Sequence, residues 1–512
     1  MAILIDHHVE RAPGFGTRIL GTFNDSSSTT KKVALAAGSI LGCAAMVAGG
    51  VFGGVFVGAG VGVVGAVVLG GSVLIDKAVV SVKKKKHAAE LVRAEQRRAQ
   101  ELAAAGPGLG VESPANLRLC SRVEDSFQWK LDLIKSAETS IELSPNFAGG
   151  RVFQEVLRAI EIRMAEKPDL RVHIIVSKDL LWKGDLKKLA RLKSRFRNRF
   201  VFLTTPRQEH WGLTGKYSIE NHTKLLIVDE KYFAIGGSGL DKKMTSETPV
   251  QISEKHPSMG RIGFRDMDVI GEGDVAQTMR HQFFELFHKW EKKVGNKKAR
   301  NRFFAFAGVK GTCARFHDPV GLFTQKRVSF LVSGREHRKA SPILQAVSSR
   351  IQAATREVRI ASFVFNFPRS MRKALAKRDL QVMGYTSGVR SKTGWFQKVI
   401  YVTFKILSQS HYGKFTKVCE ASTPNQFYHR KVMTLDGEEA IIGTHNWGIK
   451  SAYLDDEALL FIKDPEFTAA VNASLDEDEA RSTVLQGNDL KVSAIKRAVS
   501  FCFFRIFSRT WG

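Results

Sequence analysis

Two stretches of the chain share one spacing of residue types that could act together on a phosphate group. The shared pattern, HxKxxxxD, places its residues at His222, Lys224 and Asp229 and again at His429, Lys431 and Asp436. On an extended strand, a histidine and a lysine two residues apart lie on the same face. Lysine supplies positive charge to a phosphate, and histidine supplies a nucleophile or a proton donor. Each stretch therefore predicts half of a site for a phosphodiester.

The two stretches belong to an internal repeat. A shift of 207 residues superposes both motifs and also places Ile235-Gly236 on Ile442-Gly443. Between its lysine and its aspartate each copy is mainly apolar, which predicts a buried strand that returns after a short turn as a second strand. We therefore predict two related lobes, at residues 113–296 and 327–478.

Two such strands meeting between the lobes would bring two histidines and two lysines to one phosphate. One histidine would attack phosphorus and form a phosphohistidine, and the other would protonate the leaving oxygen and then activate water or an alcohol. The lysines, with Asn446 and Ser238, would offset charge on the equatorial oxygens. This scheme needs no metal and no cofactor. Each motif aspartate would orient a histidine or terminate its strand.

These residues resemble the motifs of the phospholipase D superfamily, which includes cardiolipin synthases, phosphatidyltransferases and certain nucleases. The resemblance covers residues from about 113 to 478. The second copy continues with Gly443-Thr444-x-Asn446 and then Glu457, as the family pattern does.

The first copy is similar to the bacterial lipid-synthase branch of that family, on the strength of the downstream residues 264–268, FRDMD. It departs at Gly239, where the family usually has asparagine. This departure predicts one hydrogen bond fewer to the phosphate in the first copy.

The resemblance implies a fold of two α/β lobes with the active site between them and no metal. It also implies His222 as the nucleophile and His429 as the general acid and base, while the reverse assignment stays open. We predict catalytic roles for His222, Lys224, Asp229, His429, Lys431 and Asp436, and substrate contacts from Ser238, Thr444, Asn446 and Glu457.

The elements that must position these motifs follow from apolar, β-branched runs that alternate with helical periodicity. Strands are predicted at 140–143, 171–176, 200–203, 357–363 and 380–383, and helices at 152–164 and 343–354. The alternation indicates α/β sandwich lobes with buried strands.

Ahead of the lobes, a polar segment at 1–32 is followed by 43 residues, 33–75, without a charged side chain. One helix of that length would extend about 64 Å, roughly twice the thickness of a bilayer core. Small residues recur every four positions, which lets helices pack closely in lipid, and lysines flank both ends. We predict a hydrophobic membrane hairpin; a flexible tract or a buried helix pair is the alternative.

The remaining segments are a charged helix and linker at 76–112, a linker at 297–326 and a basic amphipathic tail at 479–512. On a helix, the tail would place Ile495, Val499 and Phe503 in one apolar stripe, which is typical of an interfacial membrane helix. Packing on the second lobe is the alternative. The five cysteines are odd in number and widely spaced, as in a reducing compartment rather than a disulfide framework.

A net charge of +28 favours an anionic partner, either nucleic acid or an anionic membrane surface. The apolar stretch and the basic tail favour the membrane. We predict a membrane-associated phospholipase D-like enzyme that cleaves or transfers phosphatidyl groups of glycerophospholipids, with its lobes on the cytoplasmic side and no obligate protein partner. A nuclease on single-stranded or duplex DNA and a catalytically weakened membrane scaffold are the alternatives. The apolar stretch also resembles those of inclusion-membrane proteins from intracellular bacteria, which makes a host or inclusion membrane a candidate location.

Overall fold

The computed structural model describes residues 111–491 and residue 493, with gaps at 179–180, 206–207, 213–214, 252–259, 295–321, 338–339, 377–378, 389–401, 403–404 and 407. The predictions for 1–32, for the membrane hairpin at 33–75 and for most of 76–112, 297–326 and the tail after residue 491 lie outside these residues. Among the described helices, none combines the length and the apolar character that crossing a bilayer requires.

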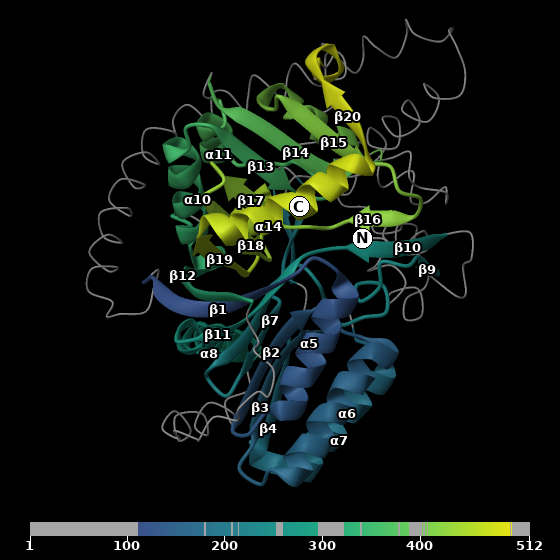
Figure 1. Ribbon diagram of the computed structural model, residues 1–512. Coiled ribbons are helices and arrows are strands. Elements are labelled where there is room, and N and C mark those ends of the chain that lie inside the picture. Colours follow the sequence, from purple (N-terminus) through teal and green to yellow (C-terminus); the bar gives the residue numbers. More distant parts are fainter. Residues whose placement is uncertain are drawn as a thin grey trace, which may run out of the picture. The chain divides into compact units, whose positions relative to one another are not determined.

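Within the described residues, 15 strands form one mixed sheet (Figure 1). In the first half of the fold, residues 113–294, they are β1 (Ser113–Cys120), β2 (Ser140–Asn146), β3 (Arg171–Ser177), β4 (Phe200–Thr205), β7 (Leu225–Val228), β8 (Tyr232–Gly236) and β11 (Asp268–Gly273). In the second half, residues 323–490, they are β12 (Phe323–Ser333), β13 (Glu357–Ala361), β14 (Gln381–Ser387), β15 (Lys417–Ala421), β17 (Val432–Leu435), β18 (Glu439–Gly443), β19 (Glu457–Lys463) and β20 (Ser482–Gln486). The prediction of an α/β fold is confirmed.

The strand order repeats between the two halves. It is β1-β11-β8-β7-β2-β3-β4 in the first half and β12-β19-β18-β17-β13-β14-β15 in the second, with β20 added at the edge. The two runs meet where β1 and β12 pair antiparallel. Because β20 pairs with β15, the sheet extends to Gln486, into residues that the sequence assigned to the tail at 479–512.

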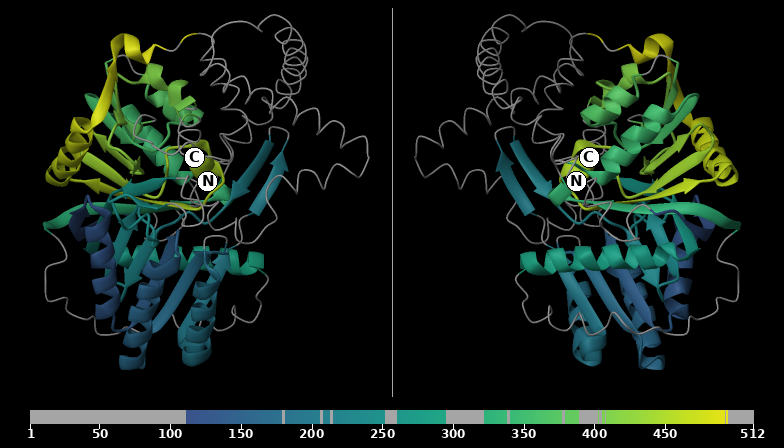
Figure 2. Two further views of the ribbon diagram at one scale, coloured as in Figure 1. Left: turned by 90° about the vertical axis from the view of Figure 1, so that its right-hand side faces the viewer. Right: turned by 90° about the vertical axis from the view of Figure 1, so that its left-hand side faces the viewer.

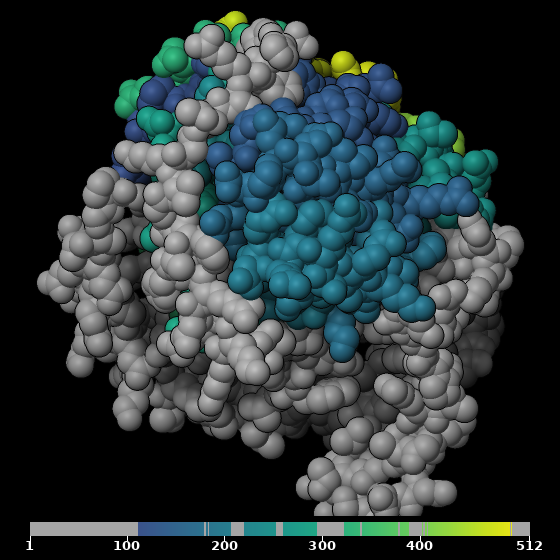
Figure 3. Space-filling view, turned by 90° about the horizontal axis from the view of Figure 1, so that it is seen from below, coloured from purple at the N-terminus to yellow at the C-terminus, as the bar shows by residue number. Residues whose placement is uncertain are grey.

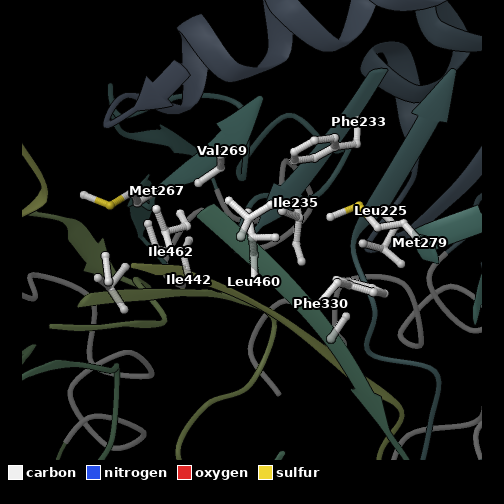
Figure 4. Close-up of a cluster of buried hydrophobic side chains, with 14 of the residues drawn as sticks. Leu225, Phe233, Ile235, Met267, Val269, Met279, Phe330, Ile442, Leu460 and Ile462 are labelled. Carbon is white, nitrogen blue, oxygen red and sulfur yellow. The ribbon is translucent and has the colours of Figure 1, made fainter. Parts of the chain in front are cut away.

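Helices cover both faces of the sheet and enclose three cores. The first half has its own core beneath α5 (Val123–Ser136), α6 (Gly150–Glu166) and α7 (Lys183–Phe196), and residues of this half form the centre of the face that Figure 3 shows. The second half has another beneath α10 (Pro342–Ala353) and α11 (Arg369–Ala374). The third core, shared by both halves, lies beneath α8 (Val275–Val294) and α14 (Pro465–Ala480). Figure 4 shows how Ile235 of the first half and Leu460 of the second meet in this shared core.

Local sequence signals fix where the two main helices of the second half begin. The Ser341 hydroxyl accepts the backbone N–H of Leu344 at 3.3 Å ahead of α10, and the Asp464 carboxylate accepts that of Phe467 at 2.7 Å ahead of α14. Both helices carry proline at their first position. A capping oxygen followed by proline satisfies the free donors of a first turn and fixes its φ angle.

The seven elements predicted from the sequence overlap β2, β3, β4, β13, β14, α6 and α10. The motif strands differ from the prediction, because β7 begins at Leu225 and β17 at Val432. The motif histidines and lysines therefore lie in the extended residues just before each strand. At both histidines the backbone N–H pairs with the opposite half of the fold.

Two smaller sheets lie beside the main one. In one, β9 (Val250–Gln251), β10 (Arg261–Arg265) and β16 (Gln426–Tyr428) join the halves, since β10 pairs in parallel with β16 (Figure 1). In the other, β5 (Gln208–Gly212) and β6 (Gly215–Ile219) form an antiparallel hairpin that appears apart from the main sheet in Figure 2 and leads to His222. Both motif histidines thus follow strands that lie outside the main sheet.

Candidate active site

His222 and Lys224 lie in the extended residues that lead into β7, and both are buried. The Lys224 Nζ lies 3.2 Å from His222 Nε2 and donates to the His222 carbonyl oxygen at 3.0 Å. On the other side of the ring, Nδ1 lies 3.0 Å from both carboxylate oxygens of Glu457. Because an ammonium group only donates, Nε2 accepts and the ring proton is assigned to Nδ1. We call His222, Lys224 and Glu457 the first half-site.

His429 and Lys431 repeat this arrangement ahead of β17. Lys431 donates to the His429 carbonyl oxygen at 2.8 Å, and its Nζ lies 3.0 Å from both ring nitrogens. The His429 Nδ1 lies 2.7 Å from Asp266 Oδ2. Three aromatic rings surround this imidazole at centroid distances of 5.2–5.9 Å, those of Phe264, Phe363 and Phe427. We call His429, Lys431 and Asp266 the second half-site.

Each histidine takes its carboxylate partner from the opposite half of the fold. Glu457 opens β19 in the second half and contacts His222 of the first, whereas Asp266 follows β10 in the first half and contacts His429 of the second. The main chain makes the same exchange. The backbone N–H of His222 donates to the carbonyl oxygen of Asp456 at 3.0 Å, and that of His429 donates to the carbonyl oxygen of Arg265 at 2.9 Å. Each acceptor is the residue just before the carboxylate partner of that histidine. Neither half-site is complete without residues of the other half.

Burial and neighbouring positive charge set the ionisation of the four basic groups. Burial lowers the pKa of Lys224 to about 7, and Lys431 contributes in the same direction; burial lowers the pKa of Lys431 to about 8. Burial, followed by Lys224 and Lys431, holds the pKa of His222 well below its ordinary value. The pKa of His429 falls to about 4 because burial and Lys431 outweigh Asp266. An anion placed among these groups would favour their charged forms, so the arrangement suits a phosphate.

Thr444, predicted as a substrate contact, follows the end of β18 and supports the first half-site. Its hydroxyl donates to the Glu457 carboxylate and accepts the backbone N–H of Ala458 at 2.9 Å. Glu457, also predicted as a substrate contact, is engaged by both Thr444 and His222. These contacts give Thr444 and Glu457 the geometry of groups that orient a histidine.

In the first half, a glycine stands where the second half has Thr444. Gly237 occupies the place that corresponds to Thr444, and a Cβ at Gly237 would collide with the Asp266 carboxylate. The missing side chain therefore leaves the space that Asp266 fills beside His429.

Ser238, predicted as a phosphate contact, belongs to a buried polar cluster in the first half. Its hydroxyl donates to Asp268 and accepts from the Lys130 Nζ at 2.7 Å, while Lys130 and Asp268 form an ion pair at 2.7 Å. Burial would raise the pKa of Asp268, but Lys130 and the hydroxyls of Ser126 and Ser238 lower it. The Ser238 hydroxyl thus has two partners within its own half.

Asn446 and Gly239 occupy corresponding places after β18 and β8. Asn446 is buried, and its Oδ1 has no hydrogen-bond partner among the described residues. This oxygen is an acceptor, so a phosphate oxygen would take its hydrogen bond from the Nδ2–H of the same amide. At Gly239, a Cβ would lie 2.7 Å from both the Cβ and the carbonyl oxygen of Phe147, whose ring centroid lies 5.9 Å from the Lys224 Nζ. Phe147 therefore occupies the space that an asparagine side chain would need.

The two motif aspartates have a structural arrangement that is the same in both halves. The Asp229 carboxylate accepts the backbone N–H groups of Glu138, Thr139 and Ser140 at 2.7–3.1 Å. The Asp436 carboxylate accepts those of Thr355, Arg356 and Glu357 at 2.8–2.9 Å. Burial would raise the pKa of Asp436, but these N–H donors outweigh it and lower the pKa. Of the two roles predicted for them, the geometry fits the one that terminates the motif strand and fixes its neighbour.

Asp266 is the site residue that the sequence reasoning missed, although it lay within the FRDMD stretch. It follows His222 by 44 residues, whereas Glu457 follows His429 by 28. The repeat shift of 207 residues therefore pairs Glu457 with Val250 and not with Asp266. Its chemistry could have identified Asp266, because a histidine held for proton transfer needs a carboxylate or carbonyl partner. In the described part of the chain, no group of histidine, cysteine, aspartate and glutamate side chains has the arrangement of a metal site.

Parts of the chain are similar to known proteins. Residues 347–479 match a family model described as "Cardiolipin synthase, PLD-like domain". The chain is 25% identical over 296 residues to the probable cardiolipin synthase YwiE of Bacillus subtilis (strain 168), a match that covers 57% of this chain and 52% of that protein. It is 38% identical over 63 residues to the minor cardiolipin synthase ClsB of the same organism, covering 12% of this chain and 16% of that protein. The chain thus spans about half the length of the first of these relatives.

One solved structure resembles the fold as a whole. The crystal structure of phosphatidylserine synthase from Haemophilus influenzae Rd KW20 aligns with a TM-score of 0.56 at 15% identity, over 81% of this chain and 98% of that one. At this identity the match is evidence for the fold alone. It covers both halves of the described sheet.

Proposed function

Because the chain belongs to the phospholipase D superfamily, we propose that it is a phosphatidyltransferase, which moves the phosphatidyl group of a glycerophospholipid to an alcohol. The observation that carries the proposal is the pair of buried histidine–lysine sets, each completed by a carboxylate from the opposite half. The curated relatives named as cardiolipin synthases support a glycerophospholipid as the substrate.

In the first step, the lone pair on His222 Nε2 attacks phosphorus and forms an N–P bond. The phosphorus–oxygen bond to the head-group alcohol breaks, and the leaving oxygen takes a proton from His429. Glu457 accepts the hydrogen bond from Nδ1–H and stabilises the positive charge that develops on the ring. The result is a phosphatidyl group held on His222 and a released alcohol.

In the second step, neutral His429 removes the proton from an acceptor alcohol, whose oxygen attacks phosphorus while the N–P bond breaks. His222 then leaves as a neutral imidazole, and His429 is protonated again for the next cycle. Three phenylalanine rings against His429 support an alcohol as the acceptor, because an apolar surround disfavours bulk water beside the proton-transfer group.

Lys224 and Lys431 stabilise the negative charge on the equatorial oxygens, together with the Asn446 amide. Before substrate binds, each lysine contacts its own histidine. We propose that the phosphate draws Lys224 away from His222 Nε2, which frees the lone pair for attack. Substrate binding would then activate the nucleophile directly.

The choice of His222 as the nucleophile follows the resemblance to the phospholipase D family, and its tautomer is compatible with that role. Lys224 donates toward Nε2, which leaves the proton on Nδ1 beside Glu457 and the lone pair on Nε2. The Asp266 carboxylate, 2.7 Å from Nδ1, holds the ring proton of His429 on that nitrogen in the same way, so the tautomer by itself does not separate the two rings. The roles of Asp229, Asp436, Thr444 and Glu457 are then to hold this geometry.

Association with a membrane is part of the proposal. Its support is the uncharged stretch at 33–75 and the basic tail at 479–512, both read from the sequence. A hairpin in the bilayer and a basic helix at its surface would hold the site at the headgroup plane. A variant that lacks 33–75 should sediment with vesicles less than the full-length protein does, while it still cleaves a soluble phosphodiester.

The test is product analysis with the full-length protein. Vesicles of phosphatidylglycerol should yield cardiolipin and glycerol, since the phosphatidyl group moves to the alcohol of a second molecule. The His222→Ala variant should give neither product, and the His281→Ala variant, which changes an exposed histidine of α8, should match the unchanged protein. Phosphatidic acid as the sole product would establish hydrolysis in place of transfer. Cleavage of single-stranded DNA with phosphatidylglycerol untouched would overturn the proposal.

A further inference from the structure

We propose that Asp478 and Asp456 are positioning residues of the active site. Asp478, on α14, makes an ion pair with Arg265, the residue before Asp266. Asp456, the residue before Glu457, makes an ion pair with Lys289 on α8. The chemistry of this proposal rests on the proposed function, but its test does not require turnover.

The first of these ion clusters, the Asp478 cluster, consists of Asp478, Arg265, Arg430 and Tyr428. Asp478 lies near the end of α14, and its carboxylate accepts from the Nε of Arg265 and from the Tyr428 hydroxyl at 2.7 Å. The Arg430 Nε lies 3.0 Å from the same carboxylate. All four residues are buried. One carboxylate therefore holds both strands of the parallel pair β10–β16.

These contacts fall on the neighbours of the second half-site. Arg265 precedes Asp266 and supplies the carbonyl that accepts the His429 N–H at 2.9 Å. Tyr428 and Arg430 flank His429 in the chain. A shift of Asp478 would therefore move both members of the His429–Asp266 pair.

The second ion cluster, the Asp456 cluster, consists of Asp456, Lys289 and Trp290. The Asp456 carboxylate accepts from the Lys289 Nζ and from the Trp290 Nε1–H at 2.6 Å, both on α8. Asp456 precedes Glu457, and its carbonyl accepts the His222 N–H at 3.0 Å. This arrangement matches the Asp478 cluster across the two halves, with the charges exchanged between helix and strand.

The sequence of α14 supports a specific requirement for Asp478. The helix ends in four consecutive acids, Asp476 to Glu479, with no basic residue in its last turn. Carboxylates at a helix C-terminus are disfavoured by the helix dipole. Each of these four acids has a basic partner from another element, and Asp478 is the buried one that bonds across the halves. Acidic residues at the C-terminal end of a helix are expected where tertiary contacts require their negative charge.

The consequence is specific to each histidine. The charged groups that face His429 are Asp266, Lys431 and Lys224. Those that face His222 are Glu457, Lys224, Lys431, Lys450 and, when it is protonated, His429. Of these, only the carboxylate in each set favours a protonated ring. Loosening one ion cluster should weaken one histidine–carboxylate contact and lower the pKa of that histidine alone.

The experiment measures each imidazole separately in the full-length protein. Exchange of the ring C2 hydrogen for deuterium, followed peptide by peptide by mass spectrometry across pH, gives one midpoint for His222 and one for His429. Two matched variants each delete one donor and keep an aromatic ring: Tyr428→Phe at Asp478 and Trp290→Phe at Asp456. Tyr428→Phe should lower the His429 midpoint by roughly half a unit to one unit and leave that of His222 in place. Trp290→Phe should do the reverse.

Two further variants complete the test. Asp478→Asn should lower the His429 midpoint further than Tyr428→Phe, and Asp476→Asn, which changes an exposed acid of the same turn that pairs with Arg359, should move neither midpoint. Midpoints of both histidines that move together in every variant, or that never move, would overturn the proposal. The crossed pattern in a protein that transfers no phosphatidyl group would uphold the positioning roles while the proposed function fails.

Discussion

The two half-sites share their backbone and differ in how their side chains are held. Both place a histidine and a lysine in extended residues before equivalent strands, and both use a motif aspartate to bind three backbone N–H groups. In the second half of the fold, Thr444 and Asn446 follow the family pattern. In the first half, glycines stand at both corresponding places, and Asp266 and Phe147 fill the space.

This difference indicates a division of work between the half-sites. The first half-site has a histidine whose Nδ1 faces both oxygens of a carboxylate and whose Nε2 faces a lysine, which suits a nucleophile. The second has a histidine enclosed by three aromatic rings, which suits a proton carrier shielded from water. The two halves thus share one backbone arrangement while their histidines have different surroundings.

The largest expected effect comes from removing either histidine. His222→Ala and His429→Ala should each reduce phosphatidyl transfer by about 10⁴-fold or more, and the double variant should be no worse than either single one, because groups that act as a unit are not additive. Initial rates on phosphatidylglycerol vesicles measure this. Near-normal transfer by His429→Ala would separate the two half-sites into independent sites and break the comparison.

The Asn446 and Gly239 positions should differ sharply in what they tolerate. Asn446→Ala should lower kcat by about 10²- to 10³-fold, as loss of one preorganised donor does. Gly239→Ala should leave the chemistry in place but lower the free energy of unfolding by about 1–3 kcal/mol, because its Cβ would overlap Phe147. Denaturant unfolding and steady-state rates measure the two effects. A fully stable Gly239→Ala would show that Phe147 does not fill this space tightly.

Anion binding should be coupled to protons through the two lysines. Burial lowers the pKa of Lys224 to about 7 and that of Lys431 to about 8, so both are largely neutral in the free protein at about pH 9. A bound anion raises both pKa values, so binding takes up protons there, and affinity falls by about tenfold per pH unit for each proton.

Titration calorimetry with tungstate, in two buffers of different ionisation enthalpy, counts these protons. Lys224→Met should remove one of them while Lys231→Met, a half-exposed lysine after the first motif, removes none. Binding of tungstate without proton uptake at about pH 9 would contradict the lowered lysine pKa values.

The smallest effect on chemistry is expected at the motif aspartates. Asp229→Ala removes the acceptor of three backbone N–H groups and should lower the free energy of unfolding by about 1–3 kcal/mol. Asp436→Ala, at a less buried position, should cost less. For both variants, kcat per folded molecule should change by less than about threefold. A loss of kcat comparable to that of the histidine variants, with stability unchanged, would give the aspartates a direct role.

Features of the fold that depend on local pattern were predictable from the sequence. The repeat of 207 residues anticipated a duplication, and the apolar residues between Lys224 and Asp229 anticipated the buried strand β7. The types of the four basic site residues already implied an anion. These features follow from periodicity and spacing, which the sequence displays directly.

The carboxylate exchange between the halves depends on long-range pairing that no local pattern encodes. Asp266 lies 44 residues after His222, the histidine of its own half, while Glu457 lies 28 residues after His429. The 207-residue shift of the repeat therefore does not align the two carboxylates. Ser238 has the right residue type for a phosphate contact, yet Lys130 and Asp268 engage its hydroxyl from elements distant in the chain. Which polar side chains remain free for a ligand is decided by the complete hydrogen-bond network.

The most direct test of the account is the identity of the covalently modified histidine. Full-length protein mixed with phosphatidylglycerol, quenched in alkali within the first turnover and analysed by peptide mass spectrometry, should carry the phosphatidyl group on His222. In the His429→Ala variant, any adduct that forms should lie on His222 and on no other residue. The His222→Ala variant should form no adduct. An adduct on His429, or transfer that proceeds with no adduct on either histidine, would contradict the assignment of the two half-sites.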